Sequence, residues 1–389
     1  MKAVFTITLL LIVALFSGCL GSSKSSTAPT LAFMYVVGQG DNGIRGFAEK
    51  TTGELQALAV PSFPTTPRPV SIALHPSKNF LYVPNLTSNT VSGFTIDHVS
   101  GVLAPIGSAL PPTPVCVSPA VCANPVGMAI NSGGQFLFVL NQGSTSPAVP
   151  ASISVFSIDP ARGLLAPVSG SPFAFASLAA PNPQSLVVSP TASFLYVSNG
   201  VGHTISAFSI GSGGALAELT PAVTVPSSTS TAATVAGLAI DPKGQFLYAA
   251  DSANNEIASF SIGGGGTLTS VGAPFPAGTK PVAVAVDSTS TFVYVANQGS
   301  NDVSAFKAAS GVLTQIAGSP FASVPTGSVG TPQPSFLTVD VSNTFLYVAN
   351  TGSSSISAFG IKASDGTLGL ITDSPFGQAI QPLWIVTTQ

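Results

Sequence analysis

Residues 80–97 read "FLYVPNLTSNTVSGFTID", and two later stretches, "FLYVSNGVGHTISAFSI" (194–210) and "FLYVANTGSSSISAFGI" (345–361), repeat this pattern with other polar letters in the middle. The pattern occurs seven times, and its copies start 46 to 58 residues apart, at Phe33, Phe80, Phe136, Phe194, Phe246, Phe292 and Phe345. This spacing is too long for a solenoid coil and is typical of a four-stranded propeller blade. The seven copies therefore predict an all-β fold, a seven-bladed β-propeller of antiparallel blades.

Each repeat has four pieces that are typical of β-strands. An apolar run such as "VSIALHP" (70–76) precedes the aromatic strand, and a polar loop follows it. A strand such as "TVSGFTID" (90–97) then leads through a glycine-containing turn into a weaker strand. These segments are rich in β-branched and aromatic residues, which favours strands. Neither strand face is cleanly polar, as expected when each blade packs between two neighbours.

The two ends of the repeat array complement each other. The first copy, at Phe33, lacks a preceding apolar run, whereas "QPLWIVTT" (381–388) is an apolar run with no aromatic strand after it. We therefore expect residues 382–388 to pair with residues 31–37. This pairing would close the ring and leave no strand edge exposed. The alternative is an open array with unpaired ends.

Composition limits the partners of the predicted domain, residues 31–389. The chain has 389 residues, of which 45% are hydrophobic and only 6% are charged, and its formal net charge is −3. Eleven Lys and Arg residues are scattered singly, so no basic stripe is available to neutralise a phosphate backbone. We expect a monomeric domain that does not bind nucleic acid.

The N-terminus predicts export. An apolar stretch, residues 3–16, is shorter than the roughly 20 residues of a spanning helix, and small residues then precede Cys19. The run "LFSGC" (15–19) resembles a bacterial lipobox, although Phe16 stands where Leu is usual. We expect a signal peptide at 1–18, lipidation of Cys19 and a flexible Ser-rich tether at 19–30. Simple secretion and an uncleaved anchor are the alternatives.

These features predict a protein anchored by lipid to the membrane of the bacterial cell envelope, at the outer membrane or outer surface. A periplasmic or secreted protein is the alternative. Two further cysteines, Cys116 and Cys122, lie six residues apart in a Pro-rich loop. That spacing fits neither a zinc site nor a redox pair, and outside the cytoplasm a local disulfide between them is expected. No metal and no cofactor are expected.

Several repeated phrases resemble those of a known family. "FLYVAN" and "ISAFSI", together with "SPF" at 171–173, 319–321 and 374–376, are similar to the repeats of the lactonase-like, YVTN-type seven-bladed propellers. The resemblance covers the chain from about residue 31 to its end. It implies the propeller fold, and it implies activity less firmly because propellers also serve as binding and structural modules.

The same resemblance indicates where an active site would be. In members credited with hydrolysing 6-phosphogluconolactone, Pro-Arg-His precedes the inner strand and Asn-Glu follows the aromatic strand. Here Val70 and Ser71 follow Pro69, and Leu86 follows Asn85. The other blades also lack Arg, His and Glu at these positions. Lactone hydrolysis is therefore the alternative prediction.

The loops after the aromatic strands and before the next inner strands are expected at one face of the ring, and we call it the loop face. Length and polar variety concentrate there, as is typical of binding loops on rigid scaffolds. Asn and Asp also close tight turns, which is the alternative role. The candidate ligand-binding residues on this face are Arg68, Asn85, Asn141, Asn199, His203, Asp251, Asn297 and Asn350.

The three histidines are placed in different turns, and only His203 is expected at the loop face, so no shared acid–base set is predicted. Polar, uncharged loops suit a glycan, a lactone or an envelope protein. We therefore predict a binding or surface module that carries its site at the loop face. A lactonase-type hydrolase and a purely structural envelope propeller are the alternatives.

Overall fold

The protein is described by a computed structural model that covers residues 28–40, 42–107, 113–114, 124–145, 148–176, 182–200, 202–228, 234–325, 330–377 and 381–388. The expected signal peptide, Cys19, Cys116, Cys122 and most of the tether lie outside the described residues. No helix in the described ranges is long and apolar enough to span a membrane.

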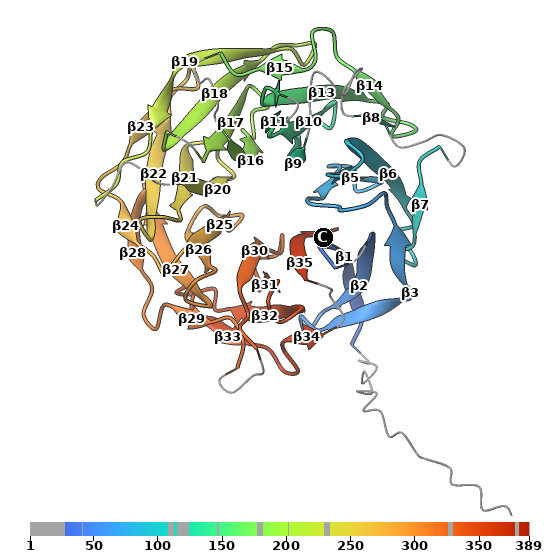
Figure 1. The fold of residues 1–389 in the computed structure, drawn as a ribbon. Coiled ribbons are helices and arrows are strands. Elements are labelled where there is room, and N and C mark those ends of the chain that lie inside the picture. Colours follow the sequence, from blue (N-terminus) through green and yellow to red (C-terminus); the bar gives the residue numbers. More distant parts are fainter. Residues whose placement is uncertain are drawn as a thin grey trace, which may run out of the picture.

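Seven antiparallel sheets surround a central opening, so the predicted seven-bladed propeller is confirmed (Figure 1). Blades are numbered in chain order, and the first contains β1 to β3 and β35. The inner strands, from the first blade to the seventh, are β35 (Pro382–Thr387), β4 (Ala73–Leu74), β9 (Pro125–Ile130), β16 (Pro183–Val188), β20 (Val235–Ile240), β25 (Pro281–Val286) and β30 (Pro334–Val339). The second strands, which carry the aromatic motif, are β1 (Thr30–Gly38), β5 (Phe80–Asn85), β10 (Phe136–Asn141), β17 (Phe194–Asn199), β21 (Phe246–Asp251), β26 (Phe292–Asn297) and β31 (Phe345–Asn350).

The outer half of each blade follows the same order. The third strands are β2 (Gly43–Lys50), β6 (Thr90–Ile96), β13 (Ser152–Ile158), β18 (Thr204–Ile210), β22 (Glu256–Ile262), β27 (Asp302–Ala309) and β32 (Ser355–Ile361). The outer strands are β3 (Leu55–Pro64), β7 (Leu103–Pro105), β14 (Leu165–Pro167), β19 (Leu216–Thr224), β23 (Leu268–Ser270), β28 (Val312–Gln315) and β33 (Leu368–Leu370). Five blades add a short strand beside the third strand: β8 (Thr113–Pro114), β15 (Phe173–Ala174), β24 (Phe275–Pro276), β29 (Phe321–Ala322) and β34 (Phe376–Gly377).

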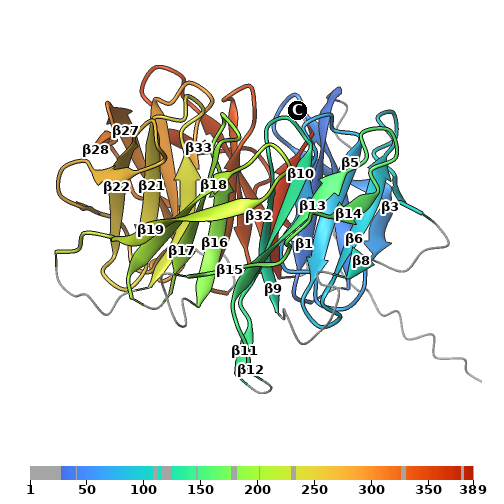
Figure 2. The same cartoon turned by 90° about the horizontal axis from the view of Figure 1, so that it is seen from above.

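The ring closes as expected, by pairing of the two ends of the repeat array. Strand β35 pairs antiparallel with β1, and the register places Val37 opposite Trp384 and Met34 opposite Thr387. Thr388 extends this pairing through two hydrogen bonds with Phe33. In Figure 2 the end of the chain lies at the face opposite the small hairpin of β11 (Ser144–Thr145) and β12 (Ala148–Val149), which projects from the loop face.

The hydrophobic core is divided into seven clusters, one at each junction between neighbouring blades. At the junction of the second and third blades, for example, Tyr82 and Val91 pack against Leu137 and Phe156. Second strands are buried on both faces for this reason, with β5 fully buried along its length. The aromatic motif is therefore a packing motif of the scaffold.

One contact repeats at every junction. The first Phe of each aromatic motif packs on a glycine in the outer turn of the next blade. A Cβ added to Gly163 would lie 2.6 Å from Phe80, and its φ of +69° is also unfavourable for other residues. The seven pairs are Phe33 with Gly101, Phe80 with Gly163, Phe136 with Gly214, Phe194 with Gly266, Phe246 with Gly311, Phe292 with Gly366 and Phe345 with Gly53.

The tyrosine of the motif strengthens this contact at five junctions. The Tyr82 hydroxyl donates to the Gly163 carbonyl at 2.7 Å, and Tyr35 bonds Gly101 in the same way at 2.8 Å. Phe138 of the third blade has no hydroxyl to donate. Burial raises the pKa of these phenols, to about 12 for Tyr196, so they remain neutral donors. The other pairs are Tyr196 with Gly266, Tyr294 with Gly366 and Tyr347 with Gly53.

We predict that Gly266→Ala lowers the free energy of unfolding by about 2–4 kcal/mol. The added methyl group would overlap the Phe194 ring, and φ is +78°. A left-handed non-glycine residue costs about 1–2 kcal/mol and overpacking about 1–3 kcal/mol. Urea unfolding measures the change. The control, Gly265→Ala, adds a methyl group that meets nothing within 4 Å. Equal stability of the two variants would contradict the proposed contact.

A buried carboxylate lies at the junction that closes the ring. Glu49 of β2 is 0% exposed and accepts hydrogen bonds from the Tyr347 hydroxyl at 3.0 Å and the Thr387 hydroxyl at 2.9 Å. Burial raises the pKa of Glu49 from 4.5 to about 7, against the opposing effect of these two hydrogen bonds, and Asp340 adds to the rise. The carboxyl group is therefore neutral in the folded state under mildly acidic conditions.

This pKa predicts a pH-dependent stability. Glu49 ionises near 4.5 in the unfolded chain and near 7 in the folded one, so stability is fullest below about 4.5 and falls as pH rises to about 7. The loss at the upper end is of the order of 3 kcal/mol. Glu49→Gln should remove this slope in urea unfolding at pH 4.5 to 8. The control variant, Asp373→Asn at an exposed carboxylate, should leave the slope unchanged.

Candidate functional site

The central channel contains a cavity of about 670 Å³, which is in the size range of small-ligand pockets. Its walls are formed mainly by the inner strands β9, β16, β20, β25, β30 and β35 (Figure 1). The lining includes Val70, Gln184 and Val282, which occupy the positions where the resembling lactonases have Arg. None of the described lining residues is ionisable. The described part of the channel lining is therefore apolar with a few neutral polar groups.

One side of the channel carries two stacked aromatic side chains. Phe336 of β30 and Trp384 of β35 have ring centroids 4.1 Å apart and an interplanar angle of 24°. Both rings are partly exposed and border the cavity. Their strands belong to the seventh and first blades, so the pair forms at the junction that closes the ring. We call Phe336 and Trp384 the aromatic wall.

The five predicted asparagines are fully buried rather than exposed at the loop face. Each Nδ2 donates to a serine hydroxyl two residues into the third strand, as Asn85 does to Ser92 at 3.0 Å. This contact ties the second strand to the third beside the turn. Ligand binding by these asparagines stays a prediction, whereas the structure gives them a scaffold contact. The other pairs are Asn141 with Ser154, Asn199 with Ser206, Asn297 with Ser304 and Asn350 with Ser357.

Arg68 is exposed on the loop face beside the channel. It precedes Pro69 with a φ of 60°, and its backbone N–H donates to Asn42 Oδ1 at 3.3 Å. Val70, two residues further on, lines the cavity. The structure therefore places this cation outside the apolar part of the channel.

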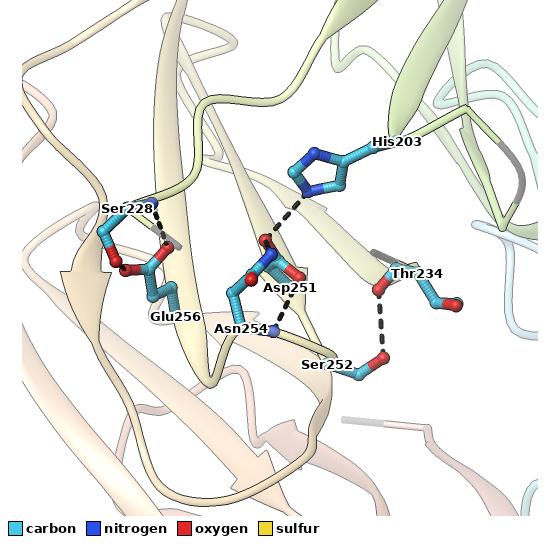
Figure 3. Close-up of polar contacts among 7 residues, drawn as sticks. All are labelled: His203, Ser228, Thr234, Asp251, Ser252, Asn254 and Glu256. Atoms are coloured by element: carbon cyan, nitrogen blue, oxygen red, sulfur yellow. Dashed lines mark hydrogen bonds and ion pairs between the residues drawn. The ribbon is translucent and has the colours of Figure 1, made fainter. Parts of the chain in front are cut away.

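Two of the predicted residues, His203 and Asp251, meet at the junction of the fourth and fifth blades (Figure 3). His203 Nε2 lies 2.8 Å from Asp251 Oδ2, and the two side chains are 1% and 0% exposed. His203 Nδ1 is buried and has no hydrogen-bond partner among the described residues. If Nε2–H donates to Asp251, then Nδ1 is left as a free proton acceptor.

The surroundings of this pair are polar. Asn254 donates to Asp251 through its side chain at 2.7 Å, and Ser252 donates to the Thr234 carbonyl at 3.0 Å. Glu256, 5% exposed, accepts hydrogen bonds from the backbone N–H and the hydroxyl of Ser228 (Figure 3). Two nearly buried carboxylates and an imidazole therefore occupy one blade junction.

This junction departs from the pattern of most others. At five of the other six junctions, the side-chain oxygen of the last residue of the polar turn accepts the backbone N–H of the residue that precedes the proline of the next inner strand. Asn89, for example, accepts from Asn124 at 2.9 Å. At the junction of the third and fourth blades the corresponding residue is Ala151, which has no side-chain acceptor. Val235 replaces that proline in the fifth blade, and His203 contacts Asp251 instead. The pair thus stands where other junctions have a hydrogen bond from a backbone N–H to a side-chain oxygen, and it joins the blades by a contact between two ionisable groups.

Sequence reasoning chose His203 and Asp251 separately but missed that they touch. The available signal was their place in the repeat, since each stands where other blades have Asn or another neutral residue. The remaining histidines lie in turns at the opposite face, where His75 contacts the Gly134 carbonyl and His98 contacts Asn79. Within the described ranges, no group of three His, Cys, Asp or Glu residues could hold a metal ion.

Comparison with known proteins gives the same architecture. A structure of a protein from Bacteroides uniformis, provisionally assigned as a 6-phosphogluconolactonase, has a TM-score of 0.74 at 18% identity and covers 92% of this chain and 99% of its own. The periplasmic gluconolactonase of Pseudomonas aeruginosa has a TM-score of 0.73 at 18% identity and covers 92% and 98%. At such identities the likeness shows the fold alone. No curated protein matches the sequence.

The family itself is identified from the sequence. The family described as "Lactonase, 7-bladed beta-propeller" matches residues 14–119 and 178–331, which together exceed half of the chain. These ranges include the aromatic strands of the first, second, fourth, fifth and sixth blades. The chain therefore belongs to the lactonase family of seven-bladed β-propellers.

Proposed function

We propose that this protein is an exported propeller that binds a neutral ligand of the sugar-lactone class in its central channel. The observation that carries the proposal is the 670 Å³ cavity whose described lining residues include no ionisable side chain. Membership of the lactonase family supports the ligand class. Export is supported by the N-terminal pattern and by the periplasmic gluconolactonase of the same fold.

The absence of charge in the described lining bears on the ligand. An ionised group moved into an apolar site without a partner loses hydration that nothing replaces, which costs several kcal/mol. Arg68 is exposed at the loop face, so it is not part of the apolar wall. Neutral Gln184 and Ser185 can instead form hydrogen bonds with hydroxyl groups. An uncharged lactone suits this channel better than a phosphorylated one.

We predict that glucono-δ-lactone stabilises the purified protein against heat and that 6-phosphogluconolactone does so more weakly. Stabilisation should grow with concentration above the dissociation constant, by about 2.7 kcal/mol at one hundred times that value. Thermal unfolding at several ligand concentrations measures it, with gluconate as the charged, ring-opened control. Stabilisation by none of these ligands would contradict the proposal and favour a structural role or a different partner.

A second candidate function is hydrolysis of a neutral lactone, favoured by the His203–Asp251 pair. An imidazole whose Nε2–H is held by a carboxylate can take a proton from water at Nδ1, and the resulting hydroxide can attack the ester carbonyl. The His203 side chain is 1% exposed, however, so this conformation offers little access to Nδ1. The geometry therefore supports binding more strongly than hydrolysis.

Turnover assays separate the two functions. If His203 is the base, His203→Asn should reduce enzyme-dependent opening of glucono-δ-lactone by about 10²- to 10⁴-fold. Asp251→Asn should also reduce it, since the imidazole would lose its orienting carboxylate. His98→Asn, at an exposed histidine on the opposite face, is the control. Unchanged turnover in His203→Asn would exclude the pair from the reaction, and no turnover in the wild-type protein would leave binding alone.

A further inference from the structure

Each inner-strand segment starts at a proline, or at Val235 in the fifth blade, and the size of its third residue differs sharply around the ring. Five blades have Ser, Gly or Ala at this position, for example Gly127, Gly237 and Ala283. The seventh and first blades have the aromatic wall instead, Phe336 and Trp384. Strands β30 and β35 are successive inner strands at the junction where the ring closes, so the two large side chains meet and stack.

We propose that the aromatic wall is the surface on which the ring of a neutral, sugar-like lactone stacks. This inference rests on the proposed function, because it assigns a place within the channel to the ligand class named there. It adds Phe336 and Trp384 as the residues that determine specificity for a ring with an apolar face.

Packing holds the wall in position. Trp384 packs against the core cluster between the first and second blades, and Phe336 packs against the clusters on both sides of the seventh blade. Each ring is thus anchored in the core, and the part of it that stays exposed borders the cavity. A rigid aromatic surface of this kind offers contact area at little entropic cost on binding.

The chemistry of the channel selects the ligand. The C–H face of a cyclic sugar derivative is apolar and packs well on an aromatic ring, while its hydroxyl groups need neutral hydrogen-bond partners. Such partners lie on β16, across the central opening from β35, where Gln184 and Ser185 line the cavity (Figure 1). The described lining offers no cation to a phosphate group.

Trp384 provides a direct test because it is the only tryptophan in the chain. We expect glucono-δ-lactone, titrated into the full-length protein, to change the tryptophan emission saturably, at the concentrations that raise the melting temperature. Trp384→Leu and Phe336→Leu should raise the dissociation constant from thermal shifts about tenfold. Trp384→Phe, which keeps an aromatic ring, should bind nearly as well as the wild type and shows that the fold tolerates a change there.

Two further variants make the outcomes distinguishable. Phe376→Leu removes a partly buried ring from β34 in the outer part of the seventh blade and should leave binding unchanged. Ala236→Leu narrows the channel from β20 with the residue type that β35 has at Leu383, so it should weaken binding wherever in the channel the ligand lies.

One result would overturn the aromatic wall and keep the channel site. In that result Ala236→Leu abolishes the thermal stabilisation, the ligand does not change the tryptophan emission, and Trp384→Leu and Phe336→Leu bind the ligand as tightly as the wild type. No stabilisation of the wild-type protein would overturn the proposed function itself. Tighter binding of 6-phosphogluconolactone than of glucono-δ-lactone would overturn the neutral ligand class.

Discussion

The contact on which the ring depends is the one between a phenylalanine and a left-handed glycine of the next blade. It occurs at all seven junctions, from Phe33 on Gly101 to Phe345 on Gly53. Only glycine both accepts the positive φ and leaves room for the ring. Because each blade buries its aromatic strand against its neighbour, no blade has a complete core of its own. The last junction can form only when β35 joins β1, and there Glu49 and Tyr347 add a buried polar contact.

This constraint also places the candidate sites. The second and third strands are used for packing between blades. The inner strands therefore line the channel, and the loops form the polar loop face. Side chains on the inner strands are thereby free to vary. Those that line the described part of the channel are apolar or neutral polar, and the largest of them form the aromatic wall. The family architecture is retained while the described channel lining carries no ionisable group.

The blade junctions differ in how they are joined at the loop face. Most use a backbone N–H accepted by a turn residue such as Asn89 or Asn301. The fourth and fifth blades use His203 and Asp251, two ionisable groups with little solvent exposure. A junction of this kind can have a chemical role or a purely structural one, and the burial of the imidazole favours the structural role unless turnover depends on it.

Much of the fold could be predicted from the repeat alone. The spacing of the aromatic motif predicted seven blades, and the unmatched apolar run at 381–388 predicted the closing strand. The candidate site was less predictable. The motif asparagines were expected at the loop face, yet their side chains turn into the blade and bond to serines such as Ser92. A strand pattern shows where a residue lies along a blade but does not show which neighbour its side chain will reach.

The sequence by itself determined the architecture, since a periodic pattern of apolar and aromatic residues has one compact solution when every repeat must cover its neighbour. It also determined that the inner strands lack the charged residues of the resembling lactonases. Only the tertiary structure decided which residues meet: Phe336 with Trp384, and His203 with Asp251. These pairs join residues 48 positions apart through contacts between blades, and such contacts exist only after neighbouring blades have packed together.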